Sequence, residues 1–178
     1  MAEVTKFDAI VVGSGVSGGW AAKELTERGL RTIVLEAGGP TTDADFVEHV
    51  QPYEMHFRGY GDRKTLMRDQ PIQRECYACD EMGHKFFVND HENPYTAPDD
   101  APFRWFRGRQ VGGRSITWGR QVYRWSDLDF TANAKDGHGN DWPIRYKDIE
   151  PWYSYVEKFI GVTGAHEGLP QLPDGEFL

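Results

Sequence analysis

Three glycines at fixed spacing are the residues whose types and positions most clearly point to chemistry. Gly13, Gly15 and Gly18 follow a short apolar run at residues 7–12 and precede a stretch with helical spacing. In a dinucleotide-binding turn the first glycine allows the sharp exit from a strand, the second lets a diphosphate approach the backbone, and the third lets the helix pack closely. The free amides and the dipole of the helix N-terminus then favour a negatively charged ligand.

An acidic residue completes this pattern. A second apolar run, at residues 31–35, ends in Glu36, about where a carboxylate accepts hydrogen bonds from ribose hydroxyls. A carboxylate there would repel a 2′-phosphate. The pattern therefore favours FAD or NAD over NADP.

The elements that must position these residues are a strand, a helix and a second parallel strand. Trp20 and Leu25 can share the sheet-facing side of the helix, and Gly29 is placed to end it. We expect an α/β, Rossmann-like fold.

Composition limits the function classes. The chain has 178 residues and a net charge of −8, with an ordinary apolar fraction of 39%. The acidic balance argues against nucleic-acid binding, and no stretch has the length of a membrane span. The N-terminus has neither a basic start nor an apolar core of a signal peptide, so we expect a cytoplasmic location.

Residues 41–100 differ in kind from the βαβ start. They are polar and contain four prolines, which predicts an irregular insertion that serves as a lid or a partner surface. Their aromatic side chains favour an ordered segment over disorder.

An arginine-rich run follows at residues 103–124. Its aromatic residues could suggest a nucleic-acid strip, but Gly112 and Gly113 fit backbone contact with a bound anionic ligand better. Pairing of these arginines with the 28 acidic residues is the simpler alternative.

The last third of the chain predicts one further helix, at residues 151–160. Pro151 suits its first turn and Gly161 its end, and an apolar face for packing comprises Trp152, Val156, Phe159 and Ile160. The tail at 164–178 is expected to be a loop. We interpret residues 1–178 as the N-terminal portion of one FAD-binding domain that is incomplete at its C-terminus.

The two glycine motifs together resemble the glucose–methanol–choline (GMC) oxidoreductases, which bind FAD. The resemblance rests on Gly13-Ser14-Gly15, Glu36, Glu92-Asn93-Pro94-Tyr95, Gly112-Gly113-Arg114-Ser115, Thr117-Trp118-Gly119-Arg120, Asp127-Leu128-Asp129-Phe130 and Asp141-Trp142-Pro143-Ile144. It is strongest for the bacterial branch with gluconate dehydrogenase and glucoside 3-dehydrogenase flavoprotein subunits and pyranose oxidases. It covers about the first third of a typical member.

The resemblance implies a set of cofactor-binding residues along the FAD molecule. The first glycine motif would hold the diphosphate, Glu36 the adenosine ribose, and the second motif the phosphates and ribityl chain. The set is Gly13, Gly15, Val16, Ser17, Gly18, Glu36, Ala37, Arg109, Gly112, Gly113, Ser115, Thr117, Trp118 and Gly119. Pyranose oxidases have a flavin-linked histidine where this chain has Thr117, so non-covalent FAD is expected.

The resemblance also implies the reaction, which is oxidation of a CH–OH group of a sugar or other alcohol by hydride transfer to FAD. An electron-acceptor or export-partner subunit is expected, and co-export could place the protein in the periplasm. The family's catalytic histidine matches no position here, so no histidine receives a catalytic role. Two alternatives remain: a non-catalytic FAD- or NAD-binding module, and an NAD-dependent enzyme that uses only the first motif.

Cys76 and Cys79 form a CxxC pair. With His84 and His91 nearby, the residue types allow a zinc site. Two cysteines are too few for an iron–sulfur cluster or a disulfide scaffold. We expect reduced thiols and no metal.

Overall fold

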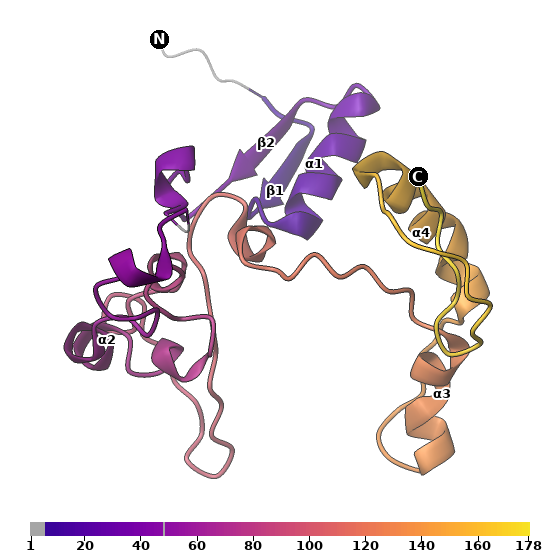
Figure 1. Cartoon of the computed structure of the whole chain (residues 1–178). Helices are drawn as coiled ribbons and strands as arrows, with labels where there is room; N and C mark the ends of the chain where they lie inside the picture. The colour runs from indigo at the N-terminus through magenta and orange to yellow at the C-terminus, as the bar shows by residue number, and fades with distance from the viewer. Residues whose placement is uncertain (1–5, 48) are drawn as a thin grey trace. The chain divides into compact units, whose positions relative to one another are not determined.

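A computed structural model describes residues 6–47 and 49–178 of the chain (Figure 1). It divides into two compact units, one extending to Trp118 and one from Gly119 to Leu178, and each is described by itself. None of the helices in these described ranges combines the length and apolarity that a membrane crossing requires.

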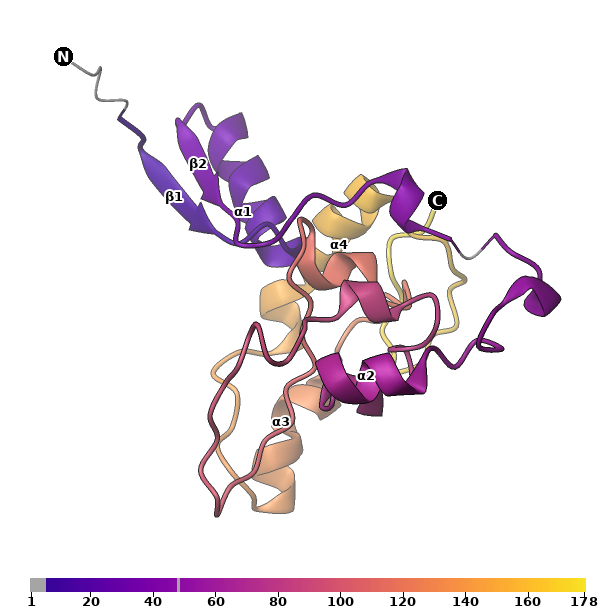
Figure 2. The same cartoon turned by 90° about the vertical axis from the view of Figure 1, so that its left-hand side faces the viewer.

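The first unit begins with a βαβ element. Strand β1 (Ala9–Val12) pairs in parallel with β2 (Thr32–Leu35), and helix α1 (Val16–Glu27) connects them. Figures 1 and 2 show α1 lying along the two strands. The expected parallel βαβ start of a Rossmann-like fold is thus confirmed.

Helix α1 ends where the sequence predicts. Gly29 has a φ of +83°, and the N–H of Leu30 donates to the carbonyl of Leu25 at 3.1 Å. This bonding satisfies carbonyls of the last turn, and the left-handed conformation is the one that glycine adopts at little cost. The glycine therefore ends the helix for a backbone reason.

The two faces of the small sheet differ. Side chains alternate along β1, so Val11 points to one face and its neighbours to the other. Val11 is buried, whereas Ile10 and Val12 are 65% and 83% exposed. The face with Val11 is thus covered and the opposite face is open among the described residues.

Buried side-chain amides order the segment at 41–100. It contains helix α2 (Arg63–Asp69) and several one-turn 3₁₀ helices. Gln73 is fully buried; its side-chain amide donates to the Asp90 carboxylate at 2.8 Å and accepts from the Arg107 N–H at 2.8 Å. Because buried polar groups need partners, these bonds hold the segment without regular elements. Its role as a lid stays a prediction.

The second unit contains helices α3 (Asp127–Asp136) and α4 (Tyr146–Ile160). Phe130, only 2% exposed, packs against the rings of Trp125 and Trp142 at centroid distances of 5.8 and 6.2 Å. These three aromatic rings form its apolar centre.

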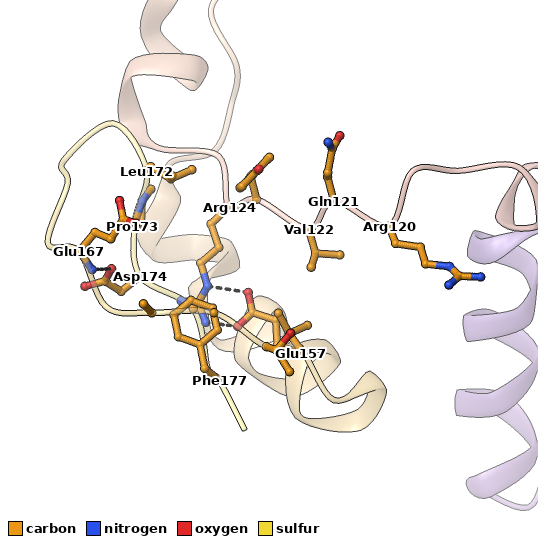
Figure 3. A pocket seen from close by; sticks show the side chains of 16 residues that line it. Arg120, Gln121, Val122, Arg124, Glu157, Glu167, Leu172, Pro173, Asp174 and Phe177 are labelled. Carbon is orange, nitrogen blue, oxygen red and sulfur yellow. Dashed lines mark hydrogen bonds and ion pairs between the residues drawn. The ribbon is translucent and has the colours of Figure 1, made fainter. Parts of the chain in front are cut away.

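A buried ion pair lies beside this centre. Arg124 donates to both carboxylate oxygens of Glu157, at 2.9 and 2.5 Å, and also to the Tyr146 and Ser154 hydroxyls. Burial alone would raise the pKa of Glu157, but hydrogen bonds from Arg124 and from the Glu176 N–H lower it. Figure 3 shows the pair at the edge of a cavity of about 300 Å³, with Val122 and Phe177 on its walls.

Helix α4 corrects the predicted helix at 151–160. It begins at Tyr146, because Asp148 accepts the Arg145 N–H at 2.8 Å in a capping arrangement, and Pro151 lies inside it. The predicted end at Gly161, with a φ of +73°, is confirmed.

The apolar face predicted for α4 is largely uncovered among the described residues. Trp152 and Phe159 are 63% and 60% exposed, and the buried residue of the helix is Glu157. The ion pair with Arg124, which connects residues far apart in sequence, decides which side of the helix is buried.

Candidate functional site

The first glycine motif forms the turn between β1 and α1. Gly13 has a φ of +88°, which favours glycine, and a Cβ atom on Gly18 would lie 2.0 Å from the Gly13 carbonyl oxygen. The turn and the close helix packing expected of these two glycines are therefore present.

The N-terminus of α1 is open to a ligand. Gly15 is the N-cap, and no side chain caps the helix or places an acid in its first turn. The Gly19 N–H donates to the Gly15 carbonyl, whereas no acceptor is recorded in the described residues for the N–H groups of Val16, Ser17 and Gly18. These amides, with the helix dipole, suit a diphosphate.

The Glu36 carboxylate faces this turn from the end of β2. One oxygen, Oε2, accepts the Ser14 N–H at 2.7 Å and the Ser14 hydroxyl at 2.5 Å, and Oε1 accepts the Gly38 N–H at 2.7 Å. These hydrogen bonds, the Ser14 hydroxyl foremost, lower the pKa of Glu36 from 4.5 to about 2. Glu36 is therefore ionised at neutral pH and can accept further hydrogen bonds.

The second glycine motif meets the first one. The Gly112 N–H donates to the Ser14 hydroxyl oxygen at 3.0 Å. Gly112 and Gly113 have φ values of +86° and +54°, and a Cβ atom on Gly113 would lie 3.4 Å from the Gly15 Cα atom. The positive φ values favour glycine at both positions, and the 3.4 Å separation is an ordinary contact distance, so the two motifs lie against each other.

A third loop, directly after β2, joins them. The Val111 N–H donates to the Gly39 carbonyl at 2.8 Å, and a Cβ atom on Gly38 would come within 2.4 Å of Gln110. Glycine is therefore required at position 38, because the backbone just before the second glycine motif passes too close to it to leave room for a side chain.

Arg109 lies next to Ala37 in the same region. Its Nε donates to the Ala37 carbonyl at 3.2 Å, and its guanidinium also donates to the Asn93 side chain. The Arg109 side chain is exposed. Asn93 thus orients a cation beside the loop that follows Glu36.

The structure brings most of the predicted site residues together within the first unit. Residues 13–18, 36–37, 109 and 112–115 converge through the contacts above. Thr117 ends the 3₁₀ turn at Gly113–Ile116, and Trp118 follows it. Gly119 belongs to the second unit, so its place relative to the others stays a prediction.

Three residues of the site were missed by the sequence reasoning. Ser14, Gly38 and Asn93 hold Glu36 and Arg109. The Ser14 position is left open by the glycine spacing, and Asn93 appears only within the Glu92–Tyr95 motif. Ser14 and Asn93 have partners 22 and 16 residues away, so no local pattern marks them, whereas Gly38 contacts Glu36 two residues away.

The arginines at 103–124 find partners in the protein itself. Arg104 pairs with Glu75, Arg124 with Glu157, and the Arg107 guanidinium lies 4.8 Å from the Trp105 ring centre. Internal contacts therefore account for much of this cationic run. Arg114, within the second glycine motif, lies 5.3 Å from the Phe87 ring centre, and Arg109 lies beside the loop that follows Glu36.

The cysteine pair has free thiols. Burial raises the pKa of Cys79 to about 12, which makes its thiol unreactive. Among residues 6–47 and 49–178, no group of three or more His, Cys, Asp or Glu side chains is arranged to hold a metal ion.

Comparison with known proteins agrees with this geometry. The family model described as FAD binding domain matches residues 8–45, which contain the βαβ element and Glu36. The fructose dehydrogenase large subunit of Gluconobacter japonicus is 24% identical over 96% of this chain and 30% of that protein. The gluconate 2-dehydrogenase flavoprotein of Pantoea cypripedii is 27% identical over 92% of this chain and 26% of that protein.

A shorter match has a higher identity. A GMC-type oxidoreductase of Mycobacterium tuberculosis is 40% identical over 67 residues, which are 36% of this chain and 11% of that protein. The chain therefore spans less than a third of the length of each of these relatives.

Proposed function

We propose that this chain is the N-terminal FAD-binding part of a GMC-type oxidoreductase and that it holds FAD in an enzyme that oxidises a CH–OH group of a sugar or other alcohol. Bound FAD supplies a hydride acceptor. The residues of this chain bind and orient it, without a covalent link through Thr117.

One observation carries the proposal. Three loops, at 13–15, 36–39 and 110–113, meet around Ser14 and Glu36 through the hydrogen bonds described above. They present a carboxylate, uncapped helix amides and closely approaching glycines to one region. The carboxylate suits a ribose, the helix amides suit a diphosphate, and the closely approaching glycines suit a ribityl chain.

The residues therefore fit FAD in their chemistry. Glu36 would accept hydrogen bonds from the ribose hydroxyls, and the amides at the start of α1 would hold the diphosphate. Arg109 would stabilise negative charge beside the second glycine motif. We assign no catalytic acid or base to this chain.

The substrate class is supported by what the relatives are named for. Two of them are a fructose dehydrogenase subunit and a gluconate 2-dehydrogenase flavoprotein, which act on a sugar and a sugar acid. The first is a large subunit, which supports a partner subunit that accepts electrons. We place the protein in the cytoplasm, or in the periplasm if such a partner exports it.

The test is the reaction of bound flavin with alcohols. Purified complete protein is saturated with FAD, freed of excess cofactor and mixed without oxygen with fructose, gluconate, glucose, glycerol and choline in turn. Bleaching of the oxidised flavin band by one of them supports the proposal. FAD retention with no bleaching by any of them would contradict the oxidation and favour a non-catalytic FAD-binding module.

A further inference from the structure

Ser14 joins the two glycine motifs through its side chain. Its hydroxyl donates to Glu36 Oε2 at 2.5 Å and accepts the Gly112 N–H at 3.0 Å, so one oxygen connects residues 22 positions ahead and 98 positions ahead in the sequence. Its own backbone N–H donates to the same Glu36 oxygen at 2.7 Å.

The hydroxyl is the side-chain partner of both groups that it contacts. Without it, Glu36 would keep the backbone N–H groups of Ser14 and Gly38, with a smaller contribution from the Ala37 N–H. Gly112 has a left-handed backbone, and Ser14 is the acceptor recorded for its N–H in the described residues. Alanine at position 14 would therefore remove one of the hydrogen bonds that orient the carboxylate and leave a half-buried N–H without its acceptor.

These two groups serve different parts of the cofactor in the proposed function. Glu36 would contact the adenosine ribose, and the loop that begins at Gly112 would contact the phosphates and the ribityl chain on the flavin side. A group that fixes both makes their geometries depend on each other, because movement of one changes the hydrogen bond to the other.

We propose that Ser14 is a positioning residue that couples the adenosine side of the FAD site to its flavin side. Its hydroxyl orients Glu36 toward the ribose and fixes the second glycine motif in its binding conformation. This inference rests on the proposed function, because it requires FAD in this site.

The coupling distinguishes FAD from FMN. FMN has the flavin, the ribityl chain and one phosphate but no adenosine, so it contacts the second glycine motif without needing Glu36. Ser14→Ala should weaken FMN binding through Gly112, and it should weaken FAD binding through both Gly112 and Glu36. Glu36→Gln should weaken FAD binding directly, and it should weaken FMN binding less, because that effect passes only through Ser14.

The experiment is a double-mutant cycle on the complete protein. Dissociation constants for FAD and FMN are measured by flavin fluorescence for the wild type, Ser14→Ala, Glu36→Gln and the double variant. We expect a loss of FAD affinity of about tenfold or more for each single variant, and a combined loss clearly smaller than the product of the two. Thr96→Ala, which removes an exposed hydroxyl with no recorded hydrogen bond in the described residues, is the control.

The outcomes separate the two claims. Wild-type protein that does not bind FAD would overturn the proposed function itself. FAD binding by Ser14→Ala equal to the wild type would overturn only the role of Ser14. A loss of FAD affinity in the double variant equal to the product of the two single losses would show that Ser14 does not act through Glu36. An unchanged FMN affinity in Ser14→Ala would show that it does not act through Gly112.

Discussion

The carbonyl oxygen of Gly13 lies 2.0 Å from the position that a Cβ atom on Gly18 would occupy. The next residue, Gly19, has no heavy atom within 4 Å of its own Cβ position. Two adjacent glycines of one helix therefore serve different purposes. One is required by the packing of α1 on the strand turn, and the other is not.

Gly18→Ala should destabilise the protein, and Gly19→Ala should not. The first change forces the backbone at Gly13 to move and should cost about 1–3 kcal/mol or more. The second replaces glycine in a helix at an open position and should gain about 0.5–1 kcal/mol. Urea unfolding of both variants measures the difference, and equal stabilities would show that the close approach does not limit the fold.

Gly15→Val should remove FAD binding while leaving the fold intact. Gly15 has a φ of −64°, which valine can adopt, but its Cβ position lies 4.0 Å from the Gly112 carbonyl oxygen, in the space between the two motifs. A branched side chain fills the route of the diphosphate to the helix amides. Circular dichroism checks the fold and a flavin titration checks binding.

Gly15→Ala provides the graded comparison. One methyl group reaches only an ordinary contact distance, so FAD affinity should fall less than in the valine variant. Wild-type affinity in Gly15→Val would remove the first glycine motif from the binding site.

Glu36→Ala should weaken FAD binding by about tenfold or more, because it removes a charged acceptor for the ribose hydroxyls. Thermal unfolding without cofactor should also occur at a lower temperature, because the Ser14 and Gly38 N–H groups lose their acceptor. Unchanged flavin retention after desalting would exclude Glu36 from the site.

The lowered pKa of Glu36 predicts a pH dependence of stability. The folded protein holds this carboxyl at about 2 against an ordinary value of 4.5, so its stabilisation is complete above pH 4.5 and is lost as the pH falls toward 2. Other acids contribute to the same slope. The comparison of the wild type with Glu36→Gln isolates this one, and identical pH slopes of the two would contradict the hydrogen bonds from Ser14 and Gly38.

The buried pair in the second unit predicts a large loss of stability in Glu157→Gln. Arg124 would stay buried without a counter-charge, which costs about 3–5 kcal/mol. Glu150→Gln, on the exposed side of the same helix, should change stability by less than about 0.5 kcal/mol. Tryptophan fluorescence during urea unfolding reports both, and a small effect in Glu157→Gln would mean that the pair is open to water.

Local constraints explain which parts could be predicted from the sequence. The βαβ element, its end at Gly29 and the convergence of Gly13, Gly18 and Glu36 follow from backbone geometry and spacing within some 25 residues. Gly112 and Gly113 already indicated backbone contact with an anionic ligand, and the resemblance to GMC oxidoreductases assigned them to FAD. It did not reveal that Ser14 joins the two motifs, because the motif leaves that position open.

Long-range polar contacts explain what could not be predicted. The partner of Arg124 lies 33 residues away, and that pair, rather than the apolar stripe with Trp152, is what α4 buries. The early start of α4 depends on the contact between Arg145 and Asp148, and Arg145 is not a typical N-cap residue. The preference of proline for the first turn of a helix therefore led the prediction to begin this helix at Pro151 instead of Tyr146.

The most direct test of this account is the visible spectrum of the complete protein after incubation with FAD and removal of unbound cofactor. We predict a retained oxidised-flavin band near one FAD per chain, lost in Gly15→Val, with no comparable retention of NAD. A colourless wild-type protein, or one that binds NAD and not FAD, would contradict the central claim that these loops form an FAD site.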